Sequence, residues 1–180
     1  YDRQKKYDYY SKKNWNVIIH CGFYTGNDIN KINESIEHSF LISKLKSKKY
    51  IFISSTVVYE GSKEIKEKAN LLINKKSSLY SKSKIICESF FGNNKTLILR
   101  LGTLVGPYMR KNTIYKILFQ ENPKINLSKT SLYSFVSYEE VFQFINLSID
   151  KNINGIFNFL RTDYKNLEYI TKYFNKSTTF

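Results

Sequence analysis

Tyr80 and Lys84 lie four residues apart in the stretch "SSLYSKSKIICE", residues 77–88. In a helix, residues at positions i and i+4 share a face, so their side chains are neighbours. A lysine ammonium beside a phenol stabilises the phenolate and lowers the tyrosine pKa from its usual value of about 10. Such a tyrosine can act as a general acid or base on a hydroxyl group. The pair therefore indicates proton-transfer chemistry, and a hydroxyl donor such as Ser55 could hold the reacting oxygen.

The spacing of this pair is weak support by itself. The pattern Tyr-x-x-x-Lys also begins at Tyr1, Tyr9 and Tyr59, as expected by chance in a chain with 15 tyrosines and many lysines. The context of Tyr80 is different, because this residue opens a predicted helix with an apolar face. It also follows, by 25 residues, a predicted strand that runs into the hydroxyl residues Ser-Ser-Thr.

The apolar patterning predicts the elements that position these residues. Short apolar runs predict buried strands at 15–22, 50–59 and 96–107, with helices between them from Ile29 and around Tyr80. The later part of the chain predicts a helix at 114–119, a strand at 133–138, a helix at 139–149, a strand at 155–160 and a helix at 167–174. Alternating strands and helices are typical of βαβ units, so we expect an α/β fold with a Rossmann-like parallel sheet flanked by helices.

The ends of the predicted strands indicate where a ligand would bind. In open α/β sheets, ligands bind beyond the carboxyl ends of the strands. The predicted strands bring three short segments to that rim: Cys21–Gly22, Ser54–Thr56 and Gly102–Thr103.

Composition limits the classes of partner. The net charge of +14 fits either a basic surface for nucleic acid or phosphorylated ligands, or a general bias toward lysine at solvated positions. The lysines are scattered and do not alternate with aromatic residues over a long run, which argues against a nucleic-acid platform. No apolar run approaches the length of about 18 residues that a membrane span needs. The two cysteines predict neither a disulfide framework nor a metal site, so a reducing, cytoplasmic setting is expected.

Several motifs in order along the chain resemble the extended short-chain dehydrogenase/reductases, the family of sugar-nucleotide epimerases and dehydratases. The strand and helix around the pair read "SSTVVYE" and "YSKSK", similar to the family's Ser-Ser-x-x-Val-Tyr-Gly strand and Tyr-x-x-x-Lys helix. Four further segments resemble family strands: "NVIIHCG", "LILRLGTLVGP", "YSFVSYEEV" and "GIFNF". The resemblance covers roughly residues 15–160.

The resemblance implies a role for each candidate residue. Lys84 would bind the nicotinamide ribose of NAD or NADP and lower the pKa of Tyr80. Tyr80 would exchange a proton with a substrate hydroxyl while the cofactor takes or gives a hydride. Ser55 would bond the same substrate oxygen. Asn33 and Gly22 would lie near the cofactor.

Departures from the family pattern narrow the expected activity. The family's 4,6-dehydratases carry an acidic pair where this chain has Thr56 and Val57, so a 4-epimerase or ketoreductase of a nucleotide sugar is the better expectation. Thr103 replaces a common asparagine on the substrate side. Tyr133 replaces an arginine that usually meets the nucleotide phosphates, and Glu60 replaces a glycine.

The family's opening strand and Gly-x-x-Gly-x-x-Gly motif have no counterpart in residues 1–20. Either the sequence is part of a complete enzyme, which its non-Met start favours, or it is a degenerate relative. We therefore expect a partial dinucleotide-binding Rossmann domain at 1–105, and at 106–180 a segment that supplies a small C-terminal substrate-binding lobe and returning elements.

Two other classes of function stay open at this point. One is a non-catalytic relative that acts as a binding or assembly module, and the other is a basic nucleic-acid binder. The family also implies a possible homodimer, paired through the Tyr80 helix and the helix at 29–45.

Overall fold

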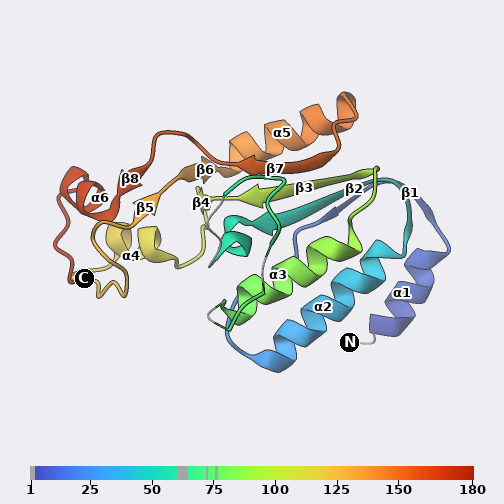
Figure 1. Ribbon diagram of the computed structural model, residues 1–180, viewed down its shortest axis with the longest axis horizontal. Coiled ribbons are helices and arrows are strands. Elements are labelled where there is room, and N and C mark those ends of the chain that lie inside the picture. Colours follow the sequence, from blue (N-terminus) through green and yellow to red (C-terminus); the bar gives the residue numbers. More distant parts are fainter. Residues whose placement is uncertain (1–2, 61–64, 72, 76) are drawn as a thin grey trace. The chain divides into compact units, whose positions relative to one another are not determined.

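The structure, a computed structural model, describes residues 3–60, 65–71, 73–75 and 77–180 (Figure 1). The described chain forms two compact units. The first contains the residues up to Leu101 together with Gln143–Asn158, and the second contains Gly102–Phe142 and Phe159–Phe180. The assignment of dinucleotide binding to 1–105 and of substrate binding to 106–180 stays a prediction.

The first unit is built on a four-stranded sheet with the strand order β1-β2-β3-β7. Its strands are β1 (Asn14–His20), β2 (Lys46–Ser55), β3 (Thr96–Leu101) and β7 (Gly155–Phe159). β2 pairs in parallel with both β1 and β3. β1 ends the strand order, so within the described residues its ladder is formed with β2 alone, and its Ile19 side chain is 47% exposed.

Helices lie along both faces of this sheet, and the predicted α/β, Rossmann-like class is confirmed (Figure 1). The helices of the first unit are α1 (Arg3–Ser11), α2 (Ile29–Ser43), α3 (Leu79–Phe90) and the later part of α5 (Tyr138–Asp150). α2 and α3 pack side by side on one face, and α5 lies on the other. Hydroxyl and carboxylate caps begin α2 and α3: Asp28 accepts N–H bonds from the first turn of α2, and Ser78 Oγ accepts one from Ser81.

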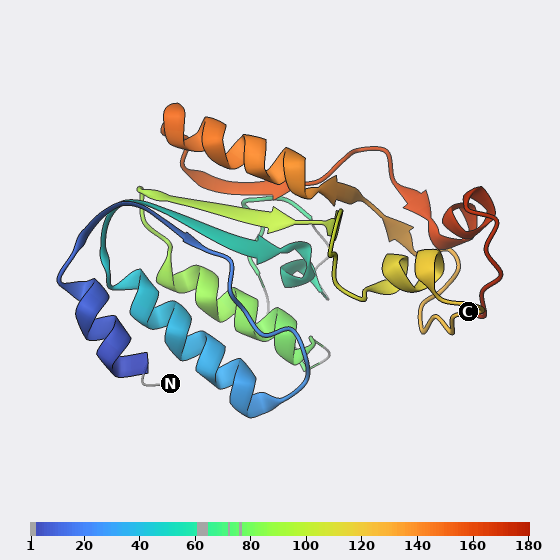
Figure 2. The same ribbon diagram turned by 180° about the vertical axis from the view of Figure 1, so that it is seen from behind.

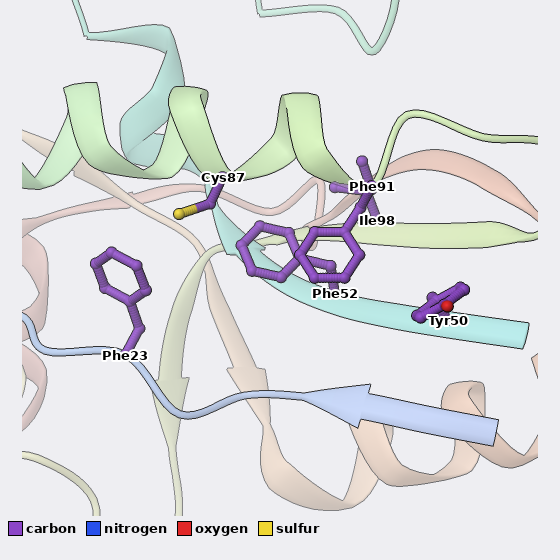
Figure 3. Packing of buried hydrophobic residues seen from close by; sticks show 6 residues of the cluster. All are labelled: Phe23, Tyr50, Phe52, Cys87, Phe91 and Ile98. Carbon is purple, nitrogen blue, oxygen red and sulfur yellow. The ribbon is translucent and has the colours of Figure 1, made fainter. Parts of the chain in front are cut away.

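The core between the sheet and the α2–α3 layer is aromatic. Its buried members are Phe23, Tyr50, Phe52, Cys87, Phe91 and Ile98 (Figure 3). The rings of Phe52 and Phe91 stack with centroids 4.8 Å apart and planes 11° apart, which joins β2 directly to the end of α3. Such ring pairs add about 0.5–1.5 kcal/mol beyond the burial of their surface.

The second unit contains short elements around a small core (Figure 2). Its strands form two two-stranded sheets, a parallel pair of β4 (Thr103–Val105) with β6 (Phe135–Ser137) and an antiparallel pair of β5 (Leu132–Tyr133) with β8 (Lys165–Asn166). Its helices are α4 (Thr113–Phe119) and α6 (Leu167–Tyr173). Its buried apolar residues are Ile114, Ile117, Ile125, Leu167 and Ile170.

Two predicted strands were wrong in extent. The strand expected at 50–59 ends at Ser55, and Thr56–Tyr59 form the 3-10 helix η1, because Ser55 Oγ caps that turn. Val58 and Tyr59 of this turn are nevertheless buried, and an apolar run alone cannot separate a buried turn from a strand. The strand expected at 96–107 is broken at Gly102 into β3 and β4, which belong to different sheets.

Smaller differences concern short elements. The polar helix α1 and the two-residue strand β8 were not predicted, and the strand expected at 133–138 is divided between β5 and β6. Among the described helices, none combines the length and the apolar character that crossing a membrane would require.

Candidate active site

Lys84 is the best-defined member of the predicted site. It lies in the middle of α3, and only 3% of its surface is exposed. Its Nζ donates a hydrogen bond of 2.9 Å to the carbonyl oxygen of Ile53, near the end of β2. A buried ammonium needs such a partner because loss of its hydration is costly.

Aromatic rings surround the Lys84 ammonium. Nζ lies 4.3 Å from the ring centroid of Phe23, 4.8 Å from that of Phe52 and 5.9 Å from that of Tyr80. The rings of Phe23 and Tyr80 are themselves 6.0 Å apart. Ring faces attract a cation, so this arrangement holds the ammonium on the same side of α3 as Tyr80.

Ser55 ends β2 at the place where α3 contacts that strand. Its Oγ accepts the Val57 N–H at 3.3 Å, which turns the chain into η1. The same turn is bonded to α3, because the Val57 carbonyl oxygen accepts a 2.9 Å hydrogen bond from Ser81 Oγ. Because Ser81 follows Tyr80 and Lys84 bonds Ile53, the structure brings Tyr80, Lys84 and Ser55 to the same end of β2.

The remaining predicted site residues lie on other segments of the described chain. Gly22 is exposed after β1, and a Cβ added there would meet no atom within 4 Å. Asn33 is exposed on α2. Thr103 is half-buried in β4 of the second unit, where its N–H donates to Ser134 O at 3.1 Å. The roles of these three residues stay predictions.

A neutral histidine lies in the aromatic core near Lys84. His20 is buried at the end of β1, and its pKa is lowered from 6.5 to about 3 by burial, and further by the charges of Lys84 and His38. Burial also raises the pKa of the Cys87 thiol on α3. Both groups are therefore uncharged at neutral pH, and neither offsets the positive charge of Lys84.

A buried ion pair that the sequence reasoning missed lies four residues further along α3. Glu88 and Arg100 are both almost fully buried, with Arg100 Nη2 donating to Glu88 Oε2 at 2.7 Å. The sequence did contain a signal, because Arg100 interrupts the apolar run "TLILRL" and a buried guanidinium needs a carboxylate. The sequence did not show which carboxylate would pair with the Arg100 guanidinium.

Comparisons with known proteins bear on the fold. No family model matches the chain, and no curated protein matches it. A dTDP-4-dehydrorhamnose reductase structure from Clostridium acetobutylicum is similar to 96% of the chain, with 17% identity and a TM-score of 0.76. A UDP-N-acetylglucosamine 4-epimerase from Methanobrevibacter ruminantium is similar to 92%, with 21% identity and a TM-score of 0.73. A dTDP-4-dehydrorhamnose reductase from Bacillus anthracis, in complex with NADP, is similar to 91%, with 21% identity and a TM-score of 0.70.

These similarities, at identities of 17–21%, confirm the Rossmann-like α/β fold that the resemblance implied. The chain spans 68% of the Clostridium structure, 61% of the Methanobrevibacter structure and 63% of the Bacillus structure.

Proposed function

We propose that the chain supplies the catalytic elements of an NAD(P)-dependent enzyme that acts on a nucleotide sugar, as a 4-epimerase or a ketoreductase. The observation that carries this proposal is the placement of Lys84 and Tyr80 on one side of α3, against the end of β2 that bears Ser55. The similar solved structures, which include a sugar-nucleotide epimerase and two reductases, support the same class.

In the proposed mechanism each side chain has one task. The Ser55 hydroxyl orients the reacting oxygen of the sugar, and the Tyr80 phenol gives a proton to that oxygen or takes one from it. The Lys84 ammonium stabilises the phenolate that remains after the proton has left Tyr80. When bound, the nicotinamide supplies or accepts the hydride.

The described residues fit one half of such a cofactor. The exposed end of β1 at Gly22 leaves room for a ligand to approach the backbone, and α3 offers the half-buried Tyr80 with the buried Lys84 ammonium beside it. The seven glycines of the chain form no Gly-x-x-Gly-x-x-Gly motif for the pyrophosphate. Lys84, Tyr80, Gly22 and Asn33 are therefore assigned to the nicotinamide side, and Thr103 to the substrate.

The residues after Ser55 favour epimerisation or reduction over elimination of water. Thr56 Oγ1 donates to the carbonyl oxygen of Leu101 at 3.3 Å, so this hydroxyl serves the backbone, and Val57 has no acidic group. An elimination would need a carboxyl group that neither position provides.

A second copy of the chain is the proposed partner of the α2–α3 layer. Phe40 on α2 is 44% exposed, and its ring makes an edge contact with Phe90 of α3 at 5.4 Å. A Phe40→Glu substitution should then shift the mass measured by light scattering from dimer to monomer. An unchanged mass would contradict a dimer interface at the α2–α3 layer.

The function is tested with Tyr80→Phe, which removes only the phenol oxygen. We expect turnover of UDP-N-acetylglucosamine with NAD, or of dTDP-4-dehydrorhamnose with NADPH, to fall by about 10²-fold or more. Tyr9→Phe is the matched control, because Tyr9 belongs to a pair of the same spacing, in which Lys13 Nζ donates to the Tyr9 hydroxyl at 2.7 Å on the surface.

Equal turnover by the Tyr80→Phe variant and the unmodified protein would contradict the enzymatic proposal. Binding of a nucleotide sugar without turnover by any form of the protein would instead support the alternative, a non-catalytic binding or assembly module.

A further inference from the structure

The Glu88–Arg100 pair joins the helix of the proposed site to the strand beneath it. We propose that Glu88 and Arg100 are positioning residues, which set the register between α3 and β2 and so place Tyr80 and Lys84 against Ser55. This inference rests on the proposed function, because positioning matters only if Tyr80 and Lys84 act on a substrate. The contacts that support it are present without a substrate.

The Glu88 carboxylate has partners on two strands. Its Oε1 accepts a 2.5 Å hydrogen bond from Ser54 Oγ in β2 and a 3.1 Å bond from Arg100 Nε in β3. Its Oε2 accepts the 2.7 Å bond from Arg100 Nη2. A carboxylate held by a two-pronged guanidinium has a fixed orientation, because both donors lie in one rigid plane.

The spacing along α3 turns this fixed orientation into a register. Glu88 follows Lys84 by four residues and Tyr80 by eight, so all three lie along one side of the helix. Lys84 bonds the carbonyl of Ile53 and Glu88 bonds the hydroxyl of Ser54. Two contacts one turn apart on the helix, to adjacent residues of the strand, limit both sliding and rotation of α3 over β2.

Arg100 also reaches the turn that follows Ser55. Its Nη1 donates to the Tyr59 hydroxyl at 2.6 Å and to the Glu67 carbonyl at 3.2 Å. Tyr59 ends η1, and its hydroxyl lies 2.7 Å from Asn158 Oδ1 in β7. One guanidinium therefore contacts both the helix that carries Tyr80 and the turn that begins at Ser55.

Stability alone does not require this arrangement. A buried ion pair can often be replaced by apolar residues of similar volume with little change in stability. Removal of one partner alone is destabilising, because the other charge stays buried without an opposite charge beside it. Apolar packing is non-directional, however, and hydrogen bonds are directional. Replacement of the whole pair is therefore the change that separates positioning from stability.

The experiment compares the unmodified protein with the double variant Glu88→Leu/Arg100→Met. The readout is the pH titration of the Tyr80 phenol, followed by NMR with ¹³C-labelled tyrosine and assigned by the loss of its signal in Tyr80→Phe. We expect the double variant to remain folded and to raise the Tyr80 midpoint by about 0.5 pH unit or more, because the phenol loses its alignment with the Lys84 ammonium. The removed pair is neutral in total, so its charge alone leaves Tyr80 little changed.

A second, milder variant covers the case in which the double variant does not fold. Ser54→Ala removes only the bond from β2 to Glu88 and retains the ion pair. We expect a smaller shift of the Tyr80 midpoint in the same direction. An unchanged midpoint in a folded double variant, or in Ser54→Ala when the double variant does not fold, would overturn the positioning role.

Lys49→Met is the matched control. Lys49 is also a buried cation of β2, but its Nζ donates to the Ile153 carbonyl and to Asn154 Oδ1, at 2.6 and 2.8 Å, far along the strand from Ser55. This variant should leave the Tyr80 midpoint unchanged, and an equal shift would show that any buried substitution in the sheet moves it.

Turnover gives an independent readout. If the proposed function holds, the double variant should lower kcat by about tenfold or more with little change in KM, because misalignment affects the reacting atoms more than binding. If no form of the protein shows turnover but the Tyr80 midpoint still shifts, the positioning role is supported and the enzymatic proposal is rejected.

Discussion

His20 and Ser39 form a buried hydrogen bond of 2.8 Å between His20 Nε2 and Ser39 Oγ, which connects β1 to α2. The Ser39 hydroxyl donates its own proton to the Ser35 carbonyl at 2.7 Å. Ser39 must therefore accept from His20, so the neutral imidazole carries its proton on Nε2. Because Nε2–H already donates in the neutral ring, this hydrogen bond forms without protonation of the imidazole.

This histidine makes stability fall in acid. The unfolded imidazole binds a proton near pH 6.5, whereas the folded one does so only near pH 3. Protons therefore favour the unfolded state between these two values, and the contribution of His20, complete above pH 6.5, is lost as the pH falls toward 3. The shift corresponds to roughly 5 kcal/mol of unfolding free energy at most.

Urea unfolding at pH 7, 5.5 and 4.5 measures this effect, with His20→Gln as the comparison because its amide does not titrate. We expect the free energy of unfolding to fall more steeply with acid in the unmodified protein than in His20→Gln. Parallel curves would show that His20 is not the group responsible.

Lys84→Met should separate stability from activity. The substitution removes a buried charge and keeps the aliphatic length, so the melting temperature should stay the same or rise while turnover is lost. The pKa of His20 should rise as well, because the Lys84 charge contributes to its lowering. NMR titration of the His20 ring measures this change, and Lys82→Met, on the same helix, should leave the titration unchanged.

The two cysteines should react at very different rates. Cys21 is exposed, whereas Cys87 is fully buried and burial raises the pKa of its thiol. Because the thiolate is the reacting form, a thiol reagent should label one cysteine in the native protein and the second only after unfolding. In Cys21→Ser no fast labelling should remain, and rapid labelling of that variant would contradict the burial of Cys87.

Two glycines should differ in their tolerance of a methyl group. A Cβ at Gly102 would lie 2.8 Å from Leu160 Cδ2 and 3.1 Å from the Ser134 carbonyl oxygen, so Gly102→Ala should cost about 1–3 kcal/mol of stability. A Cβ at Gly22 would meet no atom within 4 Å, and Gly22→Ala should leave stability unchanged or slightly higher. Denaturant unfolding of both variants gives the comparison, and equal stability would refute the close approach at Gly102.

The sequence predicted the parallel strands and the main helices because their apolar periodicity is local. It did not locate the end of β2, because the η1 turn is as apolar as the strand before it and only the Ser55 cap separates them. The interruption at Gly102 was missed for a similar reason: the run stays apolar while its hydrogen-bond partners change from one sheet to another.

The polar contacts of the site could be predicted only in part. Helical spacing is enough to predict that Tyr80 and Lys84 lie on the same side of α3. The acceptor of the Lys84 ammonium, the Ile53 carbonyl, lies 31 residues away, and the partner of Lys49 lies 104 residues away. Such contacts depend on how the strands are ordered in space, which a local pattern does not contain.

The position of β1 at the end of the sheet has a consequence for how the protein behaves in concentrated solution. The outer edge of β1 offers a row of backbone donors and acceptors that no other described strand covers, next to an exposed isoleucine at position 19. An edge of this kind is a template for further strands, whether from the same molecule or from another. Turbidity of this chain that rises with concentration, and that Ile19→Lys suppresses, would show that the β1 edge pairs with strands of other copies.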